Sequence, residues 1–228
     1  MSAELIDTTE MYLKTIFELE EDGIPPLRAR IVERLGHSGP TVSQTVGRME
    51  RDGLVTVRED RRLELTEVGR TRSLEVMRKH RLAERLLVDV IGLEWADAHE
   101  EACRWEHVIS AKVEERLSQL LGDPATDPYG NPVPGSGQAD RTETSLEGAL
   151  PQGAGQVTLS RIGEPLQAQE GLLQRFAALG LRPGTEMEIL LDQGVVRLRP
   201  VGSSARDNVA LDRALAHHLF VVADGSGL

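Results

Sequence analysis

The stretch that decides the fold of the N-terminal part is residues 28–49, which read RARIVERLGHSGPTVSQTVGRM. The first eight predict a short helix that ends at Gly36, because glycine readily takes the left-handed conformation that terminates helices. Ser38 and Pro40 then predict the start of another helix, since proline loses no hydrogen bond in a first turn. The apolar residues of its buried face recur at i, i+4 and i+7: Val42, Val46 and Met49. Two short helices around a glycine turn predict a helix-turn-helix.

The flanking segments extend this motif in both directions. Upstream, Asp7 and Glu10 predict a helix N-terminus, and Gly23 closes that helix. Downstream, residues 54–57 and 63–65 alternate around a charged turn, which predicts a hairpin. The order helix, helix, glycine turn, helix, hairpin is that of a winged helix-turn-helix. The alternative is a small α+β module with no role on DNA.

Beyond residue 65 the pattern predicts a helical part and then a strand-rich part. We expect helices over 66–91, with Gly92 as the stop, and over about 95–121, which together suit a dimerisation unit. Residues 122–155 are rich in Gly, Pro, Asp, Thr and Ser, which is typical of a linker. From Gln156 onward, alternation and turn signals predict a small β-domain with one helix at about 171–179. The fold class is therefore mainly α with a small β part.

Composition narrows the class of protein. A length of 228 residues suits two or three domains. The sequence has no run of eighteen apolar residues and no signal-like start, so no membrane contact is expected. The single cysteine, Cys103, rules out an internal disulfide framework and fits a reducing compartment. We expect a cytoplasmic protein.

The charge distribution permits DNA binding without requiring it. The net charge of -11 argues against nucleic acid as a partner, because phosphate contacts need Lys and Arg. Residues 28–62, however, contain eight arginines against five acidic residues, a modestly basic island in an acidic chain.

A set of potential metal ligands is spaced for helices. His99, Cys103, Glu106 and His107 lie four, three and one residues apart, which predicts that they project from one side of the helix over 95–121. In the preceding helix His80 and Glu84 are four apart. Thiolate, imidazole and carboxylate groups bind first-row transition metals. A single buried His or Cys is usually structural, but six such residues in two adjacent helices indicate a metal site.

Catalysis is the rival interpretation of the same residues. The sequence lacks an HExxH helix and a nucleophile elbow. Cys103 and His107 could form a nucleophilic pair, but Glu106 and the bulky Arg104 and Trp105 beside them suggest no substrate cleft. We therefore predict that the protein is not an enzyme.

The second helix of the helix-turn-helix offers polar groups to DNA. Thr41, Ser43, Gln44 and Thr45 stand between its apolar positions, and Gln can read adenine in the major groove. The alternative is a solvated polar face. For base contacts we select Ser38, Pro40 and Gln44. For phosphate contacts we select Arg28, Arg30, Thr41, Ser43, Arg51 and Arg61, the last on the wing.

Several of these runs resemble the diphtheria-toxin-repressor, or iron-dependent regulator, family. They are residues 7–13 (DTTEMYL), 26–31 (PLRARI), 38–46 (SGPTVSQTV), 77–85 (MRKHRLAER) and 101–108 (EACRWEHV). The resemblance is nearly continuous from residue 7 to about 134, and the last third is similar to the SH3-like domain of the iron-dependent subgroup. It implies a DNA-binding domain over 1–73, a metal-binding and dimerisation domain over 74–140, a flexible linker over 141–155 and an SH3-like β-barrel over 156–228.

The resemblance also implies two metal sites. The primary site would use Met11, Cys103, Glu106 and His107. The ancillary site would use His80, Glu84 and His99 with an acid and an amide from the C-terminal domain, for which residues 164–167 (EPLQ) offer Glu164 and Gln167. Glu170 and Gln174 lie nearby and could be confused with that pair.

The implied function is an Fe(II)-dependent repressor of iron-uptake and siderophore genes. Sulfur ligands favour Fe(II), Co(II) or Ni(II) over Mn(II), and several metals, Zn(II) and Mn(II) included, are expected to substitute in vitro. The implied partners are a homodimer and double-stranded DNA with a palindromic operator, with two dimers per operator in some cases. The alternatives are a manganese-responsive repressor of the same architecture, or a metal-independent winged-helix regulator with an organic effector.

Overall fold

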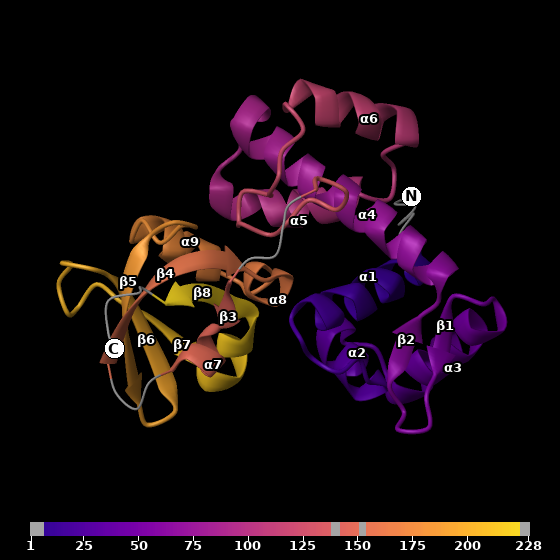
Figure 1. Cartoon of the computed structure of the whole chain (residues 1–228), viewed down its shortest axis with the longest axis horizontal. Helices are drawn as coiled ribbons and strands as arrows, with labels where there is room; N and C mark the ends of the chain where they lie inside the picture. Colours follow the sequence, from indigo (N-terminus) through magenta and orange to yellow (C-terminus); the bar gives the residue numbers. More distant parts are fainter. Residues whose placement is uncertain (1–6, 138–141, 151–153, 224–228) are drawn as a thin grey trace.

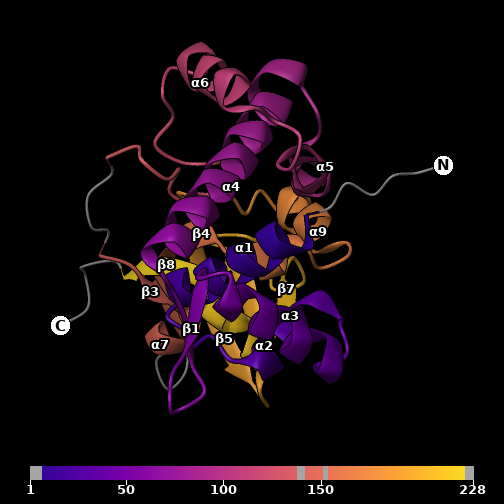
Figure 2. The same cartoon turned by 90° about the vertical axis from the view of Figure 1, so that its right-hand side faces the viewer.

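The computed structural model describes residues 7–137, 142–150 and 154–223 and shows three parts arranged around one long helix (Figures 1 and 2). The N-terminal part contains α1 (Thr8–Glu21), α2 (Arg28–Leu35), α3 (Gly39–Arg51), β1 (Val55–Val57) and β2 (Leu63–Leu65). The long helix α4 (Glu67–Arg85) leads into the helical part with η1 (Leu86–Ile91), η2 (Trp95–Asp97), α5 (Ala98–Trp105) and α6 (Ala111–Leu120). The C-terminal part contains β3 (Thr144–Ser145), α7 (Leu146–Ala149), β4 (Ala154–Ile162), α8 (Glu164–Gln167), α9 (Leu172–Ala178), β5 (Glu186–Asp192), β6 (Val195–Pro200), β7 (Val209–Asp212), η3 (Arg213–His218) and β8 (Leu219–Ala223). The predicted mainly α fold with a small β part is confirmed.

The N-terminal part is the predicted winged helix-turn-helix. Asp7 caps α1, and the side chain of Ser38 accepts a hydrogen bond from the backbone N–H of Thr41 at the start of α3. Gly36 ends α2 with φ +65°, as its position after the apolar pattern predicts. The wing is an antiparallel hairpin in which β1 pairs with β2. One core joins its elements: Tyr12, Leu13, Ile16, Ile31, Val42, Val46, Met49, Leu54, Val55, Leu63 and Leu65.

The helix α4 belongs to two parts of the molecule at once. Its first turn is capped by Thr66 and follows the wing directly, and its last turn packs in the helical part. The domain boundary that we placed after residue 73 therefore falls inside a continuous helix. The chain then passes through the π-helical segment η1, and the helix ends at Gly92, as predicted.

The continuous helix predicted over 95–121 is wrong. The structure divides it into η2, α5 and α6, with a turn over 106–110. Ser110 caps α6 with its side chain, and the β-branched Val108 and Ile109 precede it in the turn. Glu106 and His107 consequently stand in the turn after α5, whereas Cys103 stands on the helix itself.

The C-terminal part is built on a six-stranded sheet of order β3-β8-β4-β5-β6-β7, in which every pair is antiparallel. The predicted helix at about 171–179 is α9, and Phe176 buries its ring in the core of this part. The predicted linker over 141–155 is incorrect for residues 142–150, because β3 pairs with β8 and Leu146 of α7 is buried in the same core, and for residues 154–155, which begin β4. Residues 141 and 151–153 of that linker lie outside the described residues.

Residues 127–133, which the composition placed in a linker, join the helical and C-terminal parts. Tyr129 is fully buried, packs 4.9 Å from Trp95 between ring centroids, and donates a hydrogen bond to the carbonyl oxygen of Trp95. Trp95 in turn donates to the carbonyl oxygen of Pro128. Gly130, at φ +92°, approaches the backbone of Ser160 so closely that a Cβ would lie 2.3 Å from its oxygen. Composition alone could not separate this packed segment from a flexible one.

A second, polar contact joins the C-terminal part to the end of α1. Asp22, the C-cap of α1, pairs with Arg161 of β4 at 3.3 Å and with His218 of η3 at 2.6 Å. Gly163 lies beside Asp22 and His218. A Cβ at this position would be 3.4 Å from the Asp22 carboxylate and 2.8 Å from the carbonyl oxygen of His218. The segment that begins α8 is therefore held beside α1.

We expect Trp95→Ala to destabilise the protein by about 3–5 kcal/mol, because a large buried side chain shared by two parts is replaced by a cavity. Urea unfolding followed by circular dichroism measures the loss, and Leu120→Ala, at a residue with 64% of its surface exposed, is the matched control. Equal stability of the two variants would show that Trp95 does not join the parts.

Candidate metal centre

Four buried side chains from three elements converge at the centre of the molecule. His80 and Glu84 come from α4, His99 from α5, and Glu164 from α8 of the C-terminal part. His80 Nε2 lies 2.8 Å from Glu84 Oε1 and 3.3 Å from Glu164 Oε2. His99 Nδ1 lies 3.1 Å from Glu84 Oε1 and 3.5 Å from Glu164 Oε2. One ligand atom from each of the four lies within 4.8 Å of the others. The structure thus brings together four of the five residues predicted for the ancillary site.

Gln167, the fifth, is buried one turn after Glu164 on α8. Its side-chain N–H donates to the carbonyl oxygen of Ile162 at 2.7 Å, which fixes the amide. Glu170 and Gln174 are exposed, and Gln174 donates to Asp97 instead. Burial therefore favours Glu164 and Gln167 over the neighbouring Glu170 and Gln174.

The donor set fits a metal ion because polar atoms within it lack partners. Four buried atoms of the predicted ancillary residues have no hydrogen bond of acceptable geometry: His80 Nε2, Glu84 Oε2, Glu164 Oε2 and Gln167 Oε1. The ring nitrogen and the carboxylate oxygens still lie at ion-pair distances from one another. Buried polar atoms without partners cost free energy, and two imidazoles with two carboxylates suit a first-row divalent ion.

Arg81 supports this cluster from the side, and sequence reasoning did not select it. It is fully buried and pairs with Glu164 Oε1 at 3.2 Å, with Glu21 Oε2 at 2.5 Å and with Asp127 at 3.8 Å. One oxygen of Glu164 is thereby held by Arg81, and the other faces the histidines. The position of Arg81 in a helix of ordinary amphipathic pattern carries no signal of this role.

The electrostatics of the cluster are those of a cation site. Burial disfavours the charged forms of the histidines, but Glu84 and Glu164 outweigh it and hold the pKa of His80 well above its usual range. Burial likewise opposes ionisation of Glu164, but His80 and Arg81 hold its pKa well below the usual range. Against its burial, Cys103 and Glu84 raise the pKa of His99 to about 10. Protons here occupy the place that a metal ion would take.

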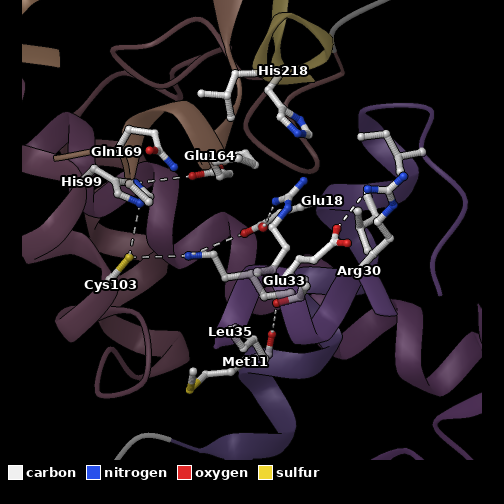
Figure 3. A pocket seen from close by; sticks show the side chains of 18 of the residues that line it. Met11, Glu18, Arg30, Glu33, Leu35, His99, Cys103, Glu164, Gln169 and His218 are labelled. Atoms are coloured by element: carbon white, nitrogen blue, oxygen red, sulfur yellow. Dashed lines mark hydrogen bonds and ion pairs between the residues drawn. The ribbon is translucent and has the colours of Figure 1, made fainter. Parts of the chain in front are cut away.

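The four residues predicted for the primary site are not assembled around one point. Cys103 Sγ lies 3.7 Å from His99 Nε2, and Glu106 Oε2 lies 2.6 Å from His80 Nδ1. His107 Nδ1 pairs with Glu10 Oε2 at 2.6 Å, while its Nε2 is 3.3 Å from Glu106 Oε1. In Figure 3 the sulfur atoms of Met11 and Cys103 lie well apart, although both residues line the same cavity.

A lysine that the sequence reasoning missed lies among these residues. Lys14 of α1 is buried, and its ammonium lies 2.8 Å from Glu106 Oε2, 3.2 Å from His80 Nδ1 and 3.9 Å from Cys103 Sγ. Burial raises the pKa of the Cys103 thiol, but Lys14 and His99 overcome this effect and lower it to about 5. In the same way, Lys14 and His80 lower the pKa of Glu106 to about 2 against the effect of burial.

A cavity of about 480 Å³ adjoins the cluster (Figure 3). Its walls come from α1 and α2, from α5 and the turn after it, and from α8 and η3. Met11, Lys14, Cys103 and Glu164 are among its lining residues, so the candidate metal ligands meet the DNA-binding part across this space.

The residues selected for DNA contacts lie on the winged-helix part, mostly at its surface. Thr41, Ser43 and Gln44 are exposed on α3, as are Ser38 and Pro40 at its start. Arg30, Arg51 and Arg61 are exposed, Arg28 is half-buried, and Arg61 takes φ +69° in the wing. Thr45, by contrast, is buried against the core, so its expected exposure is wrong.

Two family models match the chain. Residues 4–63 match the N-terminal DNA binding domain of iron dependent repressors, and residues 66–135 match the metal binding and dimerisation domain of iron dependent repressors. Together they cover more than half of the chain.

Named relatives are similar over nearly the whole chain. The diphtheria toxin repressor of Corynebacterium glutamicum is 52% identical over 225 residues, which are 96% of this chain and 97% of that protein. The iron-dependent repressor IdeR of Mycobacterium tuberculosis is 50% identical over 229 residues, 96% of this chain and 98% of that protein. Among solved structures, a manganese-dependent transcriptional repressor in complex with manganese is 28% identical with a TM-score of 0.77 and covers 95% of this chain and 100% of that one. The structure of T. acidophilum IdeR is 26% identical with a TM-score of 0.74, over 95% and 98% of the two chains.

Metal binding is expected to release protons and to tighten as the pH rises. At about pH 7 a ring whose pKa is about 10, such as that of His99, carries a proton that a metal-bound imidazole must lose. Lower pH therefore opposes binding, and the affinity should rise about ten-fold per pH unit for each proton released. Calorimetric titration with Co(II) between about pH 6 and 8, in buffers of different protonation enthalpy, measures both effects.

His217→Gln, which changes an exposed histidine outside the cluster, should leave the change of metal affinity with pH unaltered. An affinity that does not depend on pH would contradict the charged state assigned to the histidines.

Proposed function

The chain belongs to the iron-dependent repressor family, and on this basis we propose that it is an Fe(II)-activated transcriptional repressor of iron-uptake and siderophore genes. The observation that carries the proposal is the buried cluster of His80, Glu84, His99 and Glu164, which joins the helical part to the C-terminal part. It lies within and beside the region that matches the metal binding and dimerisation domain.

We assign two metal sites to each subunit. The ancillary site comprises His80, Glu84, His99, Glu164 and Gln167, and the primary site comprises Met11, Cys103, Glu106 and His107. The bound ion supplies a strong positive charge that holds ligands from different parts together. Thioether and thiolate ligands at the primary site favour Fe(II), with Co(II) and Ni(II) as close substitutes, over Mn(II).

The helix α1 is the element through which metal would act on DNA binding. It carries Met11 and packs in the core of the winged helix through Tyr12 and Ile16, and it also contacts α4. If the metal binds more tightly to one position of α1 than to another, its binding increases the population of the tighter-binding position. The size of this shift is set by the difference between the two metal affinities. Metal occupancy and the position of the recognition helix α3 are thereby linked.

A homodimer supplies the second recognition helix. Large apolar side chains are exposed on the helical part, which matches the dimerisation domain: Val90, Ile91, Val108 and Val113. Such surface is typical of subunit contacts. A two-fold dimer places its recognition helices in half-sites about 34 Å apart, which predicts a palindromic operator that one or two dimers occupy.

Within each subunit, α3 enters the major groove. Ser38, Pro40 and Gln44 contact base edges, and Arg28, Arg30, Thr41, Ser43, Arg51 and Arg61 contact phosphates. The chain acts as a regulator and not as an enzyme, and it works in the cytoplasm. No helix of the described residues has the length and apolar character needed to span a membrane.

A manganese-responsive repressor is the second candidate, since similar solved structures include a manganese-dependent repressor bound to manganese. The sulfur atoms of Met11 and Cys103 argue against it, because Mn(II) prefers oxygen ligands. A metal-independent regulator with an organic effector would use the cavity beside α1 but leaves the unpaired atoms of the His80–Glu164 cluster without a role.

Anaerobic Fe(II) is expected to switch on binding to a palindromic iron-box operator, because the metal at the primary site would join Met11 of the DNA-binding part to Cys103, Glu106 and His107 of the helical part. Fluorescence anisotropy of labelled DNA during Fe(II) titration of apo-protein measures this. Removal of Fe(II) by a chelator should reverse it, and Mn(II) at cytosolic concentrations should not replace it. DNA binding that survives chelation would refute metal activation, and equal activation by Mn(II) would favour the manganese sensor.

Gln44→Ala should relax base preference at one operator position by about 1–3 kcal/mol, because it removes a base-edge contact. Arg28→Ala should weaken binding to all sequences alike and lower the salt dependence by about one unit of slope, because it removes a phosphate contact. Competition binding with single-base operator variants at several salt concentrations separates the two. A Gln44→Ala protein that discriminates as the wild type does would remove Gln44 from base reading.

A further inference from the structure

The ammonium of Lys14 lies among candidate primary ligands, where its positive charge balances their negative charge. Three potential metal ligands surround it, with Nζ 2.8 Å from Glu106 Oε2, 3.2 Å from His80 Nδ1 and 3.9 Å from Cys103 Sγ. Glu18, one turn further along α1, is 4.0 Å away. Lys14 is only 7% exposed, so its charge is compensated by Glu106, Glu18 and Cys103 and little by water.

A second side chain of α1 that contacts these ligands is negatively charged, whereas Lys14 is positively charged. Glu10, one turn before Lys14 on α1, holds His107 Nδ1 at 2.6 Å. The side chains of Glu10 and Lys14 thus engage His107, Glu106 and Cys103, three of the four proposed primary ligands. Met11, the fourth, is separated from Cys103 (Figure 3).

We propose that Lys14 is a tethered cation that occupies the primary ligand set in the metal-free protein, and that it sets metal affinity because an incoming ion must displace it. This inference rests on the proposed function and adds a residue that is not itself a ligand. A divalent ion and an ammonium a few ångströms apart inside a protein repel each other strongly, so the two cannot share Glu106 and Cys103.

Displacement of Lys14 is linked to the position of Met11, because both residues belong to α1. Met11 and Lys14 are three residues apart on α1 and so lie on the same side of the helix. A metal ion held by both Met11 and Cys103 must bring the two sulfur atoms together, and a shift of α1 would do this. The cavity of about 480 Å³, which Lys14 also lines, gives the displaced side chain space. The winged helix, which shares its core with α1, would move with it.

A purely structural ion pair makes the opposite prediction. If Lys14 only stabilised the fold, its removal would take one cationic partner from the buried Glu106, lower the stability and weaken or preserve metal binding. If Lys14 competes with metal, its removal strengthens metal binding. The sign of the change in affinity therefore separates the two roles.

The test is a Co(II) titration of the full-length apo-protein, followed by the near-ultraviolet absorption of a Co(II)–thiolate bond. Cys103 is the sole cysteine of the chain, so this absorption reports only those ions that Cys103 binds. We expect Lys14→Leu, which removes the charge and adds no metal-binding atom, to lower the Co(II) Kd by about ten-fold or more. Lys14→Arg should bind like the wild type or more weakly. Lys112→Leu, at an exposed lysine outside the site, is the control for net charge and should leave the Kd unaltered.

Unchanged or weaker Co(II) binding by a folded Lys14→Leu protein would overturn the proposal. A wild-type protein that forms no Co(II)–thiolate bond and gains no DNA binding with metal would instead refute the proposed function. The two failures are therefore distinguishable.

A second measurement needs no variant and remains informative if Lys14→Leu fails to fold. An amine-acetylating reagent is applied to wild-type protein with and without Co(II), and the modified peptides are quantified by mass spectrometry. Displacement should raise acetylation of Lys14 several-fold relative to the exposed Lys112. Equal acetylation in both states would show that Lys14 keeps its place when metal binds.

Discussion

The structure depends on the ion-pair network centred on Glu164. This single carboxylate lies on a short helix of the C-terminal part, yet its two oxygens face groups of the helical part, with Arg81 on one side and His80 and His99 on the other. Asp22, at the end of α1, forms ion pairs with Arg161 and His218 of the C-terminal part, beside the segment that carries Glu164. Beside the buried contact of Trp95 with Tyr129, the three parts of the chain are therefore held together by charged groups taken out of water. Such a junction is strong only while every charge has a partner, which makes it sensitive to the arrival of a further cation.

The same property explains how one cluster can serve both folding and regulation. An apolar interface would hold the parts together with or without a ligand. A junction of two histidines and two carboxylates with buried atoms that lack hydrogen bonds offers a place for protons or for a metal ion. Helix α1 lies next to this junction and within the core of the DNA-binding part. The family relationship and the physical arrangement thus agree on a protein whose DNA-binding part responds to the occupant of its centre.

Much of the local structure could be predicted from the pattern of residues. The helix over 28–35 ends at Gly36, and the next helix begins at Ser38, because capping and glycine conformations are decided by neighbours in the chain. The pattern misled us where local signals were weak. Glycine- and proline-rich residues near 130 resembled a linker, but Tyr129 is fully buried against Trp95. The break after α5 was also missed, and with it the fact that Glu106 and His107 stand in a turn.

The sequence by itself determined the winged helix-turn-helix, the helical and β parts, and the chemical types of the ligand residues at helical spacing. It did so because periodicity, caps and ligand chemistry are properties of a few adjacent residues. Only the tertiary structure decided that Glu164 meets His80 across 84 positions of chain, that Arg81 holds its second oxygen, and that Lys14 lies between Glu106 and Cys103. These contacts join distant segments, and the free energy of a buried charge depends on every group around it, wherever that group stands in the sequence.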